Sequence, residues 1–173
     1  MNIQAPKFLL NGPLGSLSEC HRRIENSLQG LQEIVKDAPV DGLPPPFRAR
    51  LESLLDFFST TVKRHTLDEE MSLFPRLRMD PLADLIIEKL EADHKRAESL
   101  YQTVETLGRD WLASGSIDSF PRYNLREAVE ALHELSDEHF KIEEQRLFPL
   151  AAGRLDSQTL RQLGKEMALR REL

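Results

Sequence analysis

The chain has 173 residues with a net charge of −6 at pH 7, and 40% of its residues are hydrophobic. This length is typical of one domain, and the interspersed, slightly acidic charge argues against a nucleic-acid-binding face, which would need to be basic. The single cysteine, Cys20, excludes an intrachain disulfide framework, while the absence of a signal peptide or a bilayer-length apolar run predicts a cytoplasmic protein without membrane contact.

The first half of the chain predicts two amphipathic helices, because its apolar residues recur at three- and four-residue spacing. Residues 1–15 read as a non-helical lead-in, after which Ser16 or Ser18 caps the first helix. That helix ends before the proline-rich stretch 38–46, and the last proline of this stretch starts the second helix. Pro75 ends or kinks the second helix.

The second half repeats this plan. Asp80 caps a third helix that the run 114–116 ends, and Ser119 opens a fourth helix that Pro149 and Gly153 close. Asp156 or Ser157 caps a short C-terminal helix at about 156–173. This helix either covers one end of the bundle or meets a partner.

Four long helices with short connections predict an all-α, up-down-up-down four-helix bundle with an additional short C-terminal helix. We expect a single domain over residues 1–173, with the bundle at about 14–150. Solvent exposure is expected for the arginines of the C-terminal helix, Arg161, Arg170 and Arg171.

One motif occurs twice. Residues 65–75 and 139–149 both read H-x-x-x-E-E-x-x-L-F-P, 74 positions apart. A looser pair, 21–25 and 94–98, each begins with His and ends with Glu, 73 positions apart. The chain is therefore a doubled unit, and we expect an approximate two-fold axis that places equivalent side chains opposite one another.

The doubled motif predicts a metal site. A His and a Glu at i and i+4 lie on the same helix face, which here is the apolar face. Because an unpaired buried carboxylate is costly, two that converge require cations between them. If both carboxylates bridge, each of two ions receives four protein bonds and keeps room for a bridging oxygen and an open position; this suits iron better than zinc, with manganese also possible. The candidate ligands are His21, His65, Glu69, His94, His139 and Glu143.

These residues and the L-F-P after each His/Glu pair resemble the hemerythrin-like (HHE cation-binding) family over about residues 14–150. The resemblance implies a four-helix bundle with two non-heme iron ions, oxo- or hydroxo-bridged and shared by Glu69 and Glu143. It assigns His21 and His65 to one iron, and His94 and His139 to the other.

One position departs from the oxygen-carrying hemerythrins, which have a further His where this chain has Glu98; the equivalent on the first helix is Glu25. This favours oxidation, peroxide or NO chemistry, or iron sensing, over reversible O2 carriage. Glu98 is either a ligand, a residue that orients a His ring, or a solvated side chain.

We therefore expect a bacterial di-iron protein that binds O2, NO or peroxide at an open coordination position, in sensing, storage or stress response. The alternative is a di-iron enzyme of peroxidase or oxidase type, or an iron-donating repair protein. A structural bundle without metal is the third class, which the doubled ligand pattern disfavours. Outside the pattern, we expect His133 at the surface or rim, Cys20 and Tyr101 packed in the core, and Glu70 and Glu144 solvated.

Overall fold

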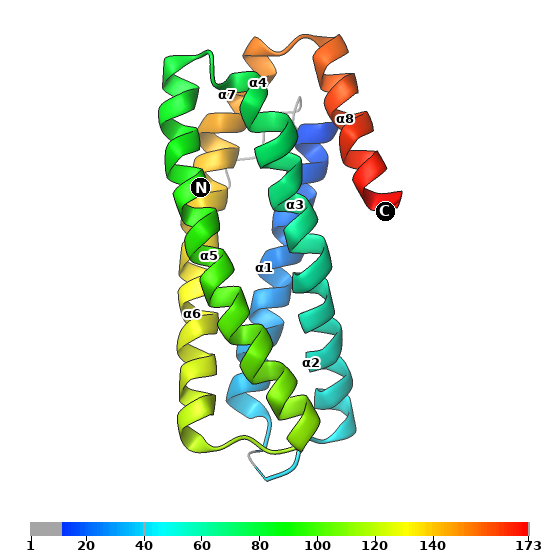
Figure 1. The fold of residues 1–173 in the computed structure, drawn as a ribbon, viewed down its shortest axis with the longest axis vertical. Coiled ribbons are helices and arrows are strands. Elements are labelled where there is room, and N and C mark those ends of the chain that lie inside the picture. Colours follow the sequence, from blue (N-terminus) through cyan, green and yellow to red (C-terminus); the bar gives the residue numbers. More distant parts are fainter. Residues whose placement is uncertain (1–11, 40, 173) are drawn as a thin grey trace, which may run out of the picture. The chain divides into compact units, whose positions relative to one another are not determined.

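The computed structural model describes residues 12–39 and 41–172, and no strand occurs among them. This confirms the predicted all-α fold, a helical bundle with an additional C-terminal helix (Figure 1). The elements are the α-helices α1 (Pro13–Asp37), α2 (Pro45–Phe57), α3 (Lys63–Asp68), α4 (Phe74–Leu77), α5 (Pro81–Ser114), α6 (Ser119–Ile142), α7 (Phe148–Arg154) and α8 (Ser157–Glu172), and the π-helical segments η2 (Phe58–Val62), η3 (Glu69–Leu73) and η4 (Glu143–Leu147).

The start of α1 differs from the prediction. The helix begins at Pro13, a favourable first position because proline lacks the N–H that would have no partner there. The predicted lead-in is therefore wrong for residues 13–15, and its residues 1–11 lie outside the described part of the chain. Neither predicted serine caps α1: the Ser16 hydroxyl donates to the Gly12 carbonyl, and the Ser18 hydroxyl donates to Glu144.

The later helix starts agree closely with the prediction. The second begins at Pro45, one residue early, and Val40 of the preceding stretch lies outside the described residues. The Asp80 side chain accepts hydrogen bonds from the backbone N–H groups of Leu82 and Ala83, as an N-cap does. Asp156 caps α8 in the same way.

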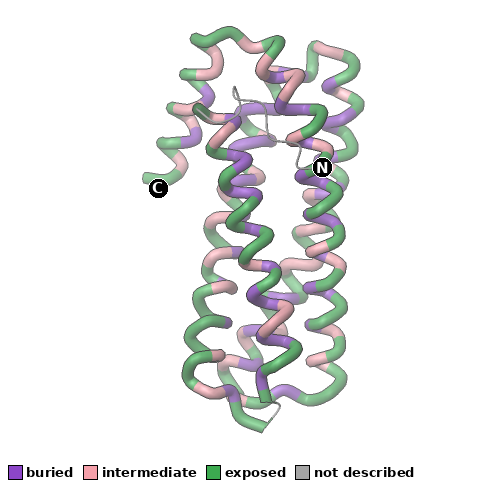
Figure 2. Tube along the Cα trace, turned by 180° about the vertical axis from the view of Figure 1, so that it is seen from behind, coloured by how far each residue is buried: buried purple, intermediate pink, exposed green. Residues whose placement is uncertain are grey.

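The described residues form two compact units, and α1, α5 and α6 run through both. The first unit contains the described residues of Met1–Arg23, Lys63–Asp93 and Glu138–Leu173. The second contains those of Ile24–Val62 and His94–Asp137. Within each unit, buried positions recur every three or four residues along the helices. Figure 2 colours the buried positions purple.

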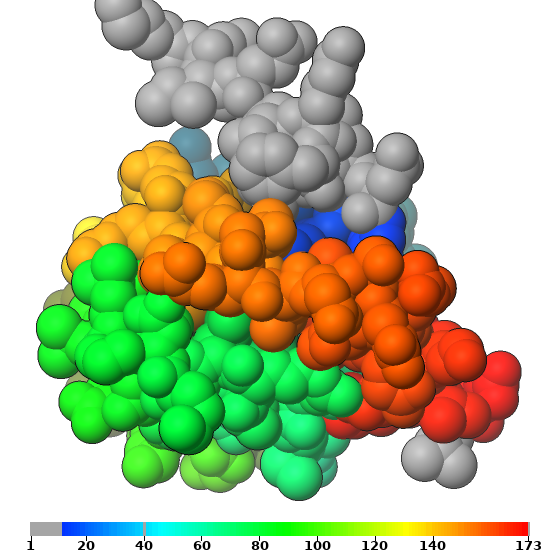
Figure 3. All heavy atoms as spheres, turned by 90° about the horizontal axis from the view of Figure 1, so that it is seen from above, coloured from blue at the N-terminus to red at the C-terminus, as the bar shows by residue number. Residues whose placement is uncertain are grey.

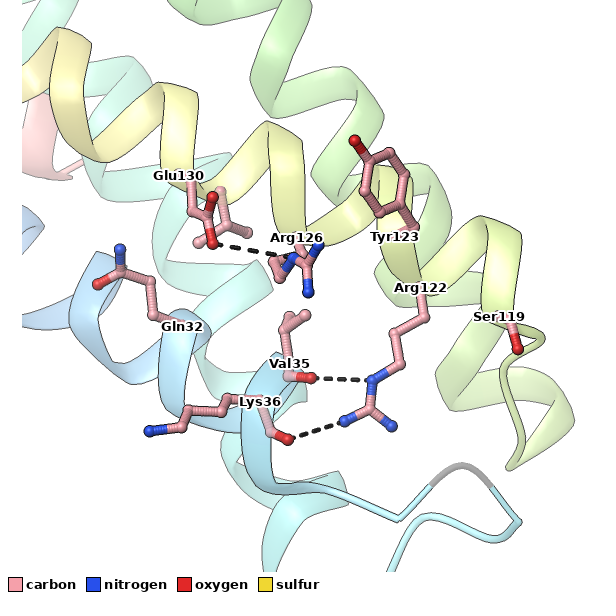
Figure 4. A pocket seen from close by; sticks show the side chains of 9 residues that line it. Gln32, Val35, Lys36, Ser119, Arg122, Tyr123, Arg126 and Glu130 are labelled. Atoms are coloured by element: carbon pink, nitrogen blue, oxygen red, sulfur yellow. Dashed lines mark hydrogen bonds and ion pairs between the residues drawn. The ribbon is translucent and has the colours of Figure 1, made fainter.

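The second unit has an apolar interior. A Cβ on Gly108 would lie 2.9 Å from a methyl carbon of Leu55, so this glycine allows α5 to pack closely against α2. At the far end of α1, the Arg122 guanidinium donates to the carbonyls of Val35 and Lys36 (Figure 4). These bonds satisfy carbonyls that a helix C-terminus leaves without partners. The interior side chains include Ile24, Leu28, Leu31, Ile34, Leu51, Leu55, Val104, Trp111, Leu125 and Leu132.

The first unit combines an apolar cluster with buried charge. Leu163 and Met167 of α8 belong to its core, so the C-terminal helix covers part of this unit, one of the two predicted roles. Every buried His, Asp and Glu among the described residues also lies in this unit. The other core members include Leu14, Leu17, Leu73, Phe74, Leu77, Ile87, Leu90, Leu147, Phe148 and Ala151.

Both copies of the motif change helix type at their first Glu. In η3 the Phe74 N–H donates to the Glu69 carbonyl, and in η4 the Phe148 N–H donates to the Glu143 carbonyl. Each π-helical turn is followed by the proline of the motif, which has no N–H and whose ring crowds the preceding turn. A wider turn accommodates that proline, and such π-bulges are frequent at functional sites.

Candidate metal centre

Four predicted ligands come together in the first unit. His21, His65, Glu69 and Glu143 each offer one nitrogen or oxygen atom, and these atoms all lie within 4.8 Å of one another. All four side chains are buried, and both carboxylates are fully shielded from solvent. They come from α1, α3, η3 and η4, so both copies of the motif contribute.

The contacts between them pair each imidazole with a carboxylate. His65 Nε2 lies 3.1 Å from Oε1 of Glu69, four residues later on the same helical segment. His21 Nε2 lies 3.1 Å from Oε2 of Glu143 and 4.0 Å from Oε1 of Glu69. The rings of His21 and His65 are 4.9 Å apart and nearly perpendicular, so their nitrogen atoms face a shared space with the two carboxylates.

His139 extends the cluster. Its Nε2 lies 3.5 Å from Oε1 of Glu143, and Glu69, Glu143 and His139 also offer atoms within 4.8 Å of one another. Its Nδ1 lies 3.6 Å from Oδ2 of Asp93, which is also paired with Lys89. The remaining predicted ligand, His94, follows Asp93 on α5, is half-buried and belongs to the second unit; its role stays a prediction.

Glu144 is not simply solvated, contrary to the sequence-based expectation. Its Oε1 accepts a hydrogen bond from the Ser18 hydroxyl at 2.7 Å and lies 2.9 Å from His21 Nδ1. A carboxylate at Nδ1 keeps the proton of a neutral ring on that nitrogen and leaves Nε2 for a metal. The ring of Phe140 stacks on His21 at 4.1 Å, which further fixes the plane of the imidazole.

In the metal-free cluster, the pKa values of three imidazoles are raised. Burial alone would lower the pKa of each imidazole, but the facing carboxylates outweigh it. Glu69 and the Cys20 thiol raise the pKa of His65 to about 10, and Glu143 with Asp93 raises that of His139 to about 9. The pKa of His21 also lies well above its usual value, since Glu143 and Glu144 face the ring. Without metal, the rings themselves therefore carry the charge that the carboxylates require, which the sequence-based prediction had left to metal ions alone.

The hydrogen bonding of the cluster is incomplete among the described residues. Neither oxygen of Glu143 accepts a hydrogen bond of good geometry, and Nε2 of His21 makes none either. Buried polar atoms in this state are uncommon and call for an explanation. Imidazole nitrogens together with carboxylate oxygens form a donor set that suits iron, manganese or zinc, so the residues fit a metal.

The other predicted residues fall around this cluster in different ways. Glu25 and Glu98 are exposed, which favours the solvated alternative for Glu98. Cys20 is buried, as predicted. Tyr101 is half-buried beside Phe58 in the second unit, so it is only partly a core residue. His133 is half-buried, in agreement with a rim position.

Sequence reasoning missed the residues that support the ligands. Asp93 and Cys20 precede the two looser-motif histidines at equivalent positions of the repeat, and each acts on a ring of a neighbouring helix. Glu144 was visible as the second Glu of the E-E pair, but its direction was not. The buried Asp68 gave no signal, because its partners lie about a hundred residues away.

Comparison with known proteins identifies a cation-binding family. A family model described as the hemerythrin HHE cation binding domain matches residues 13–151, and it matches residues 87–168 as well. A Haemophilus influenzae protein described as an uncharacterized protein is 23% identical over 164 residues, which cover 94% of this chain and 92% of that protein.

Among the described residues, none of the helices combines the length and the apolar character that a membrane span requires.

Proposed function

Because the chain belongs to the hemerythrin HHE cation-binding domain family, we propose that its buried His and Glu cluster holds two non-heme iron ions. The observation that carries the proposal is Glu143, a fully buried carboxylate without a well-formed hydrogen bond and with an imidazole on either side. A buried carboxylate of this kind is stable only beside positive charge, which the metal ions would supply once the imidazoles give up their protons to bind them. Manganese is the second choice, because it accepts the same nitrogen and oxygen donors.

The proposed ligand assignment reflects the two repeats. His21 and His65 serve one ion, His139 serves the other, and Glu69 and Glu143 are shared. We assign the remaining position to His94, because it repeats His21 at the spacing of the duplication. Two imidazoles and two shared carboxylates give each ion four protein bonds, which is fewer than six-coordinate iron accepts.

The residues around the cluster prepare it for a small ligand. Glu144 orients His21 through Nδ1, and the Phe140 and Phe148 rings lie nearly parallel to the imidazole, at 4.1 and 5.6 Å, where they keep water away. When bound, the metal pair would supply coordination and electron-transfer chemistry for O2, NO or peroxide. We propose that the protein binds such a ligand in sensing, storage or stress response, inside a bacterial cell.

Two substitutions test the ligand assignment. We expect His65→Ala and Glu143→Ala to lose iron after anaerobic loading, since each removes a donor from the buried cluster. His133→Ala is the matched control, because this fifth histidine lies outside the repeated pattern and is expected to leave the iron content unchanged. Iron and protein are measured on the same sample. Full retention of both ions in either ligand variant would refute the assignment.

A second experiment separates ligand binding from catalysis. The loaded protein is titrated anaerobically with NO, and then separately with O2 and with peroxide, while its absorption spectrum is recorded. A reversible spectral change with constant iron content supports a binding or sensing protein. Multiple turnovers, or release of iron during the reaction, would instead identify the enzyme or iron-donor alternative.

A further inference from the structure

The C-terminal helix is attached to the ligand-bearing segment by charge. Asp68 precedes Glu69 and comes three residues after His65, and its side chain is fully buried. Its Oδ1 accepts a hydrogen bond from Arg170 at 2.7 Å, and its Oδ2 accepts one from Arg171 at 2.9 Å. Both arginines belong to α8, so two cations of the last helix neutralise one buried carboxylate next to a proposed metal ligand.

The attachment continues along η3. The second terminal nitrogen of Arg170 donates to the Ser72 hydroxyl at 2.6 Å. Arg76 donates to the Ser72 carbonyl at 2.6 Å and to Glu166 of α8 at 2.7 Å. Figure 3 shows α8, in orange to red, lying beside the teal-green segment that contains α3 and η3. The π-helical turn that starts at Glu69 is thus held by α8 at several points.

The second copy of the motif lacks these contact groups. The positions 74 residues after Asp68, Ser72 and Arg76 are Ile142, Arg146 and Leu150. None of them offers a carboxylate or a hydroxyl. These polar contacts of α8 therefore act on one half of the doubled unit, and the two halves differ in the ion pairs and hydrogen bonds that hold them.

We propose that α8 is a latch that positions His65 and Glu69, with Arg170 and Arg171 as its positioning residues. The proposal rests on the metal pair described above and extends it: retention of the ion served by His21 and His65 depends on α8, whereas the ion served by His139 depends on it less. Arg170 is the main contact, since it reaches two partners and only 21% of its side chain is exposed. Arg171 is 44% exposed, so solvent weakens its ion pair.

The physical basis is the buried charge on Asp68. Removing one partner of a buried ion pair leaves its charge less compensated, here with only the more exposed Arg171, and such a charge draws in water or moves toward it. Because Asp68 is adjacent to Glu69 in the chain, its displacement moves the end of the π-helical turn that carries the ligand. Partners outside the ligand set typically change metal affinity by about 10- to 100-fold when they are removed.

The test compares three variants of the full-length protein. Arg170→Gln removes the charge and the forked contact, and Arg170→Lys keeps the charge but cannot reach Asp68 and Ser72 together. Arg154→Gln is the matched control: it breaks an ion pair of 2.8 Å with Asp80 in the same unit, away from the proposed ligands.

The first readout is hydrogen exchange of the metal-free protein. In Arg170→Gln we expect peptides covering residues 63–77 to exchange at least about tenfold faster, with the peptides of 137–151 unchanged, since local opening is confined to the latched segment. Arg170→Lys is expected to recover part of this protection, and Arg154→Gln to leave both segments unchanged. An equal increase in both segments would overturn the latch, because it would mean a general loss of stability.

The second readout is iron retention against a chelator. We expect Arg170→Gln to lose one of two ions about 10- to 100-fold faster than wild type. Wild-type protein that binds no iron would refute the metal pair itself. Wild-type protein with two ions, beside an Arg170→Gln variant that retains both equally well, would overturn the latch alone. If Arg170→Gln fails to fold, the double variant Asp68→Asn, Arg170→Gln removes both charges together with the Arg170 contacts to Asp68 and Ser72. We expect it to fold and to lose the same ion faster than wild type, but by less than the single variant because no uncompensated charge remains; retention equal to wild type would overturn the latch.

Discussion

Loading the metal-free protein with iron should release protons, and their number depends on how far the facing carboxylates raise the pKa values of the imidazoles. A ring nitrogen must lose its proton before it binds a metal. In the metal-free cluster the carboxylates hold those protons on the imidazoles, with the pKa of His65 at about 10 and that of His139 at about 9. His21 adds a third raised pKa. Metal binding and deprotonation are therefore coupled.

The expected number of protons is set by these pKa values. At pH 7.5 both His65 and His139 are more than about nine-tenths protonated, so together they release about two protons, and His21, whose pKa is also raised, adds to this release. At pH 9.5 the two rings with stated values together hold only about one proton. Rings with an ordinary pKa of 6.5 would release about 0.1 proton each at pH 7.5.

Calorimetric titration measures this release. Ferrous iron is added anaerobically to metal-free protein in two buffers of different ionisation enthalpy, and the difference in heat gives the protons released per protein. The titration is repeated at pH 9.5. A metal-bound water that ionises would also release protons, but its share would not fall as the pH rises. The decline between the two pH values is therefore the signature of the imidazoles.

Two results would refute this reasoning. Release of fewer than about 0.5 protons at pH 7.5 would mean that the rings are neutral before the metal binds. A release that stays constant or grows at pH 9.5 would place the protons on another group. In either case the facing carboxylates would not be the source of the raised pKa values.

The contacts of the two units support three further predictions. The melting temperature of the metal-free protein should fall as the pH rises from about 6.5 through 9 to 10, because groups with a raised pKa stabilise the fold below their unfolded value and lose this effect above the folded one. The melting temperature should also fall below about pH 4.5, because the pKa of Glu143 is lowered in the folded protein and the ionised carboxylate stabilises the fold only above that range. A melting temperature that does not change with pH in calorimetry would contradict both expectations. Glu144→Ala should weaken iron binding about tenfold by releasing His21 Nδ1, while Glu144→Gln, which can still accept that hydrogen bond, should lose much less in the same chelator competition. Leu28→Ala should cost about 2–5 kcal/mol of unfolding free energy in urea, with the iron content unchanged, because Leu28 is fully buried in the apolar unit.

The fold and most of the cluster could be predicted from the sequence because both depend on local spacing. Apolar residues at three- and four-residue intervals define one face of each helix, and a His and a Glu four residues apart on that face must meet. The duplication further predicts that the His/Glu faces of the two motif copies lie opposite each other. This is why the sequence alone places His65 with Glu69, and His139 with Glu143.

The supporting contacts could not be predicted in the same way. The direction of Glu144 depends on the π-helical turn that contains it, and periodicity assumes a regular α-helix through that position. The pair between Asp68 and Arg170 joins residues 102 positions apart, and no local pattern specifies such a partner. Arg170 and Arg171 looked solvated because each was considered without the surface on which α8 lies, whereas Arg161 is exposed as predicted.

The π-helical turns also bear on how such a chain can change by insertion and deletion. The π-helical turn holds one residue more than an ordinary turn, so if Glu143–Leu147 became α-helical at the same length, the His139 and Glu143 spacing would stay intact but the downstream residues would turn by about 100°. Phe148, whose ring now lies 5.6 Å from His21, would then point elsewhere. Deleting one residue at the same time would restore the direction of the downstream residues. A relative of the same length with a regular helix here could thus keep every residue that binds the ion while losing the apolar wall beside it, and a list of ligands would not reveal the difference.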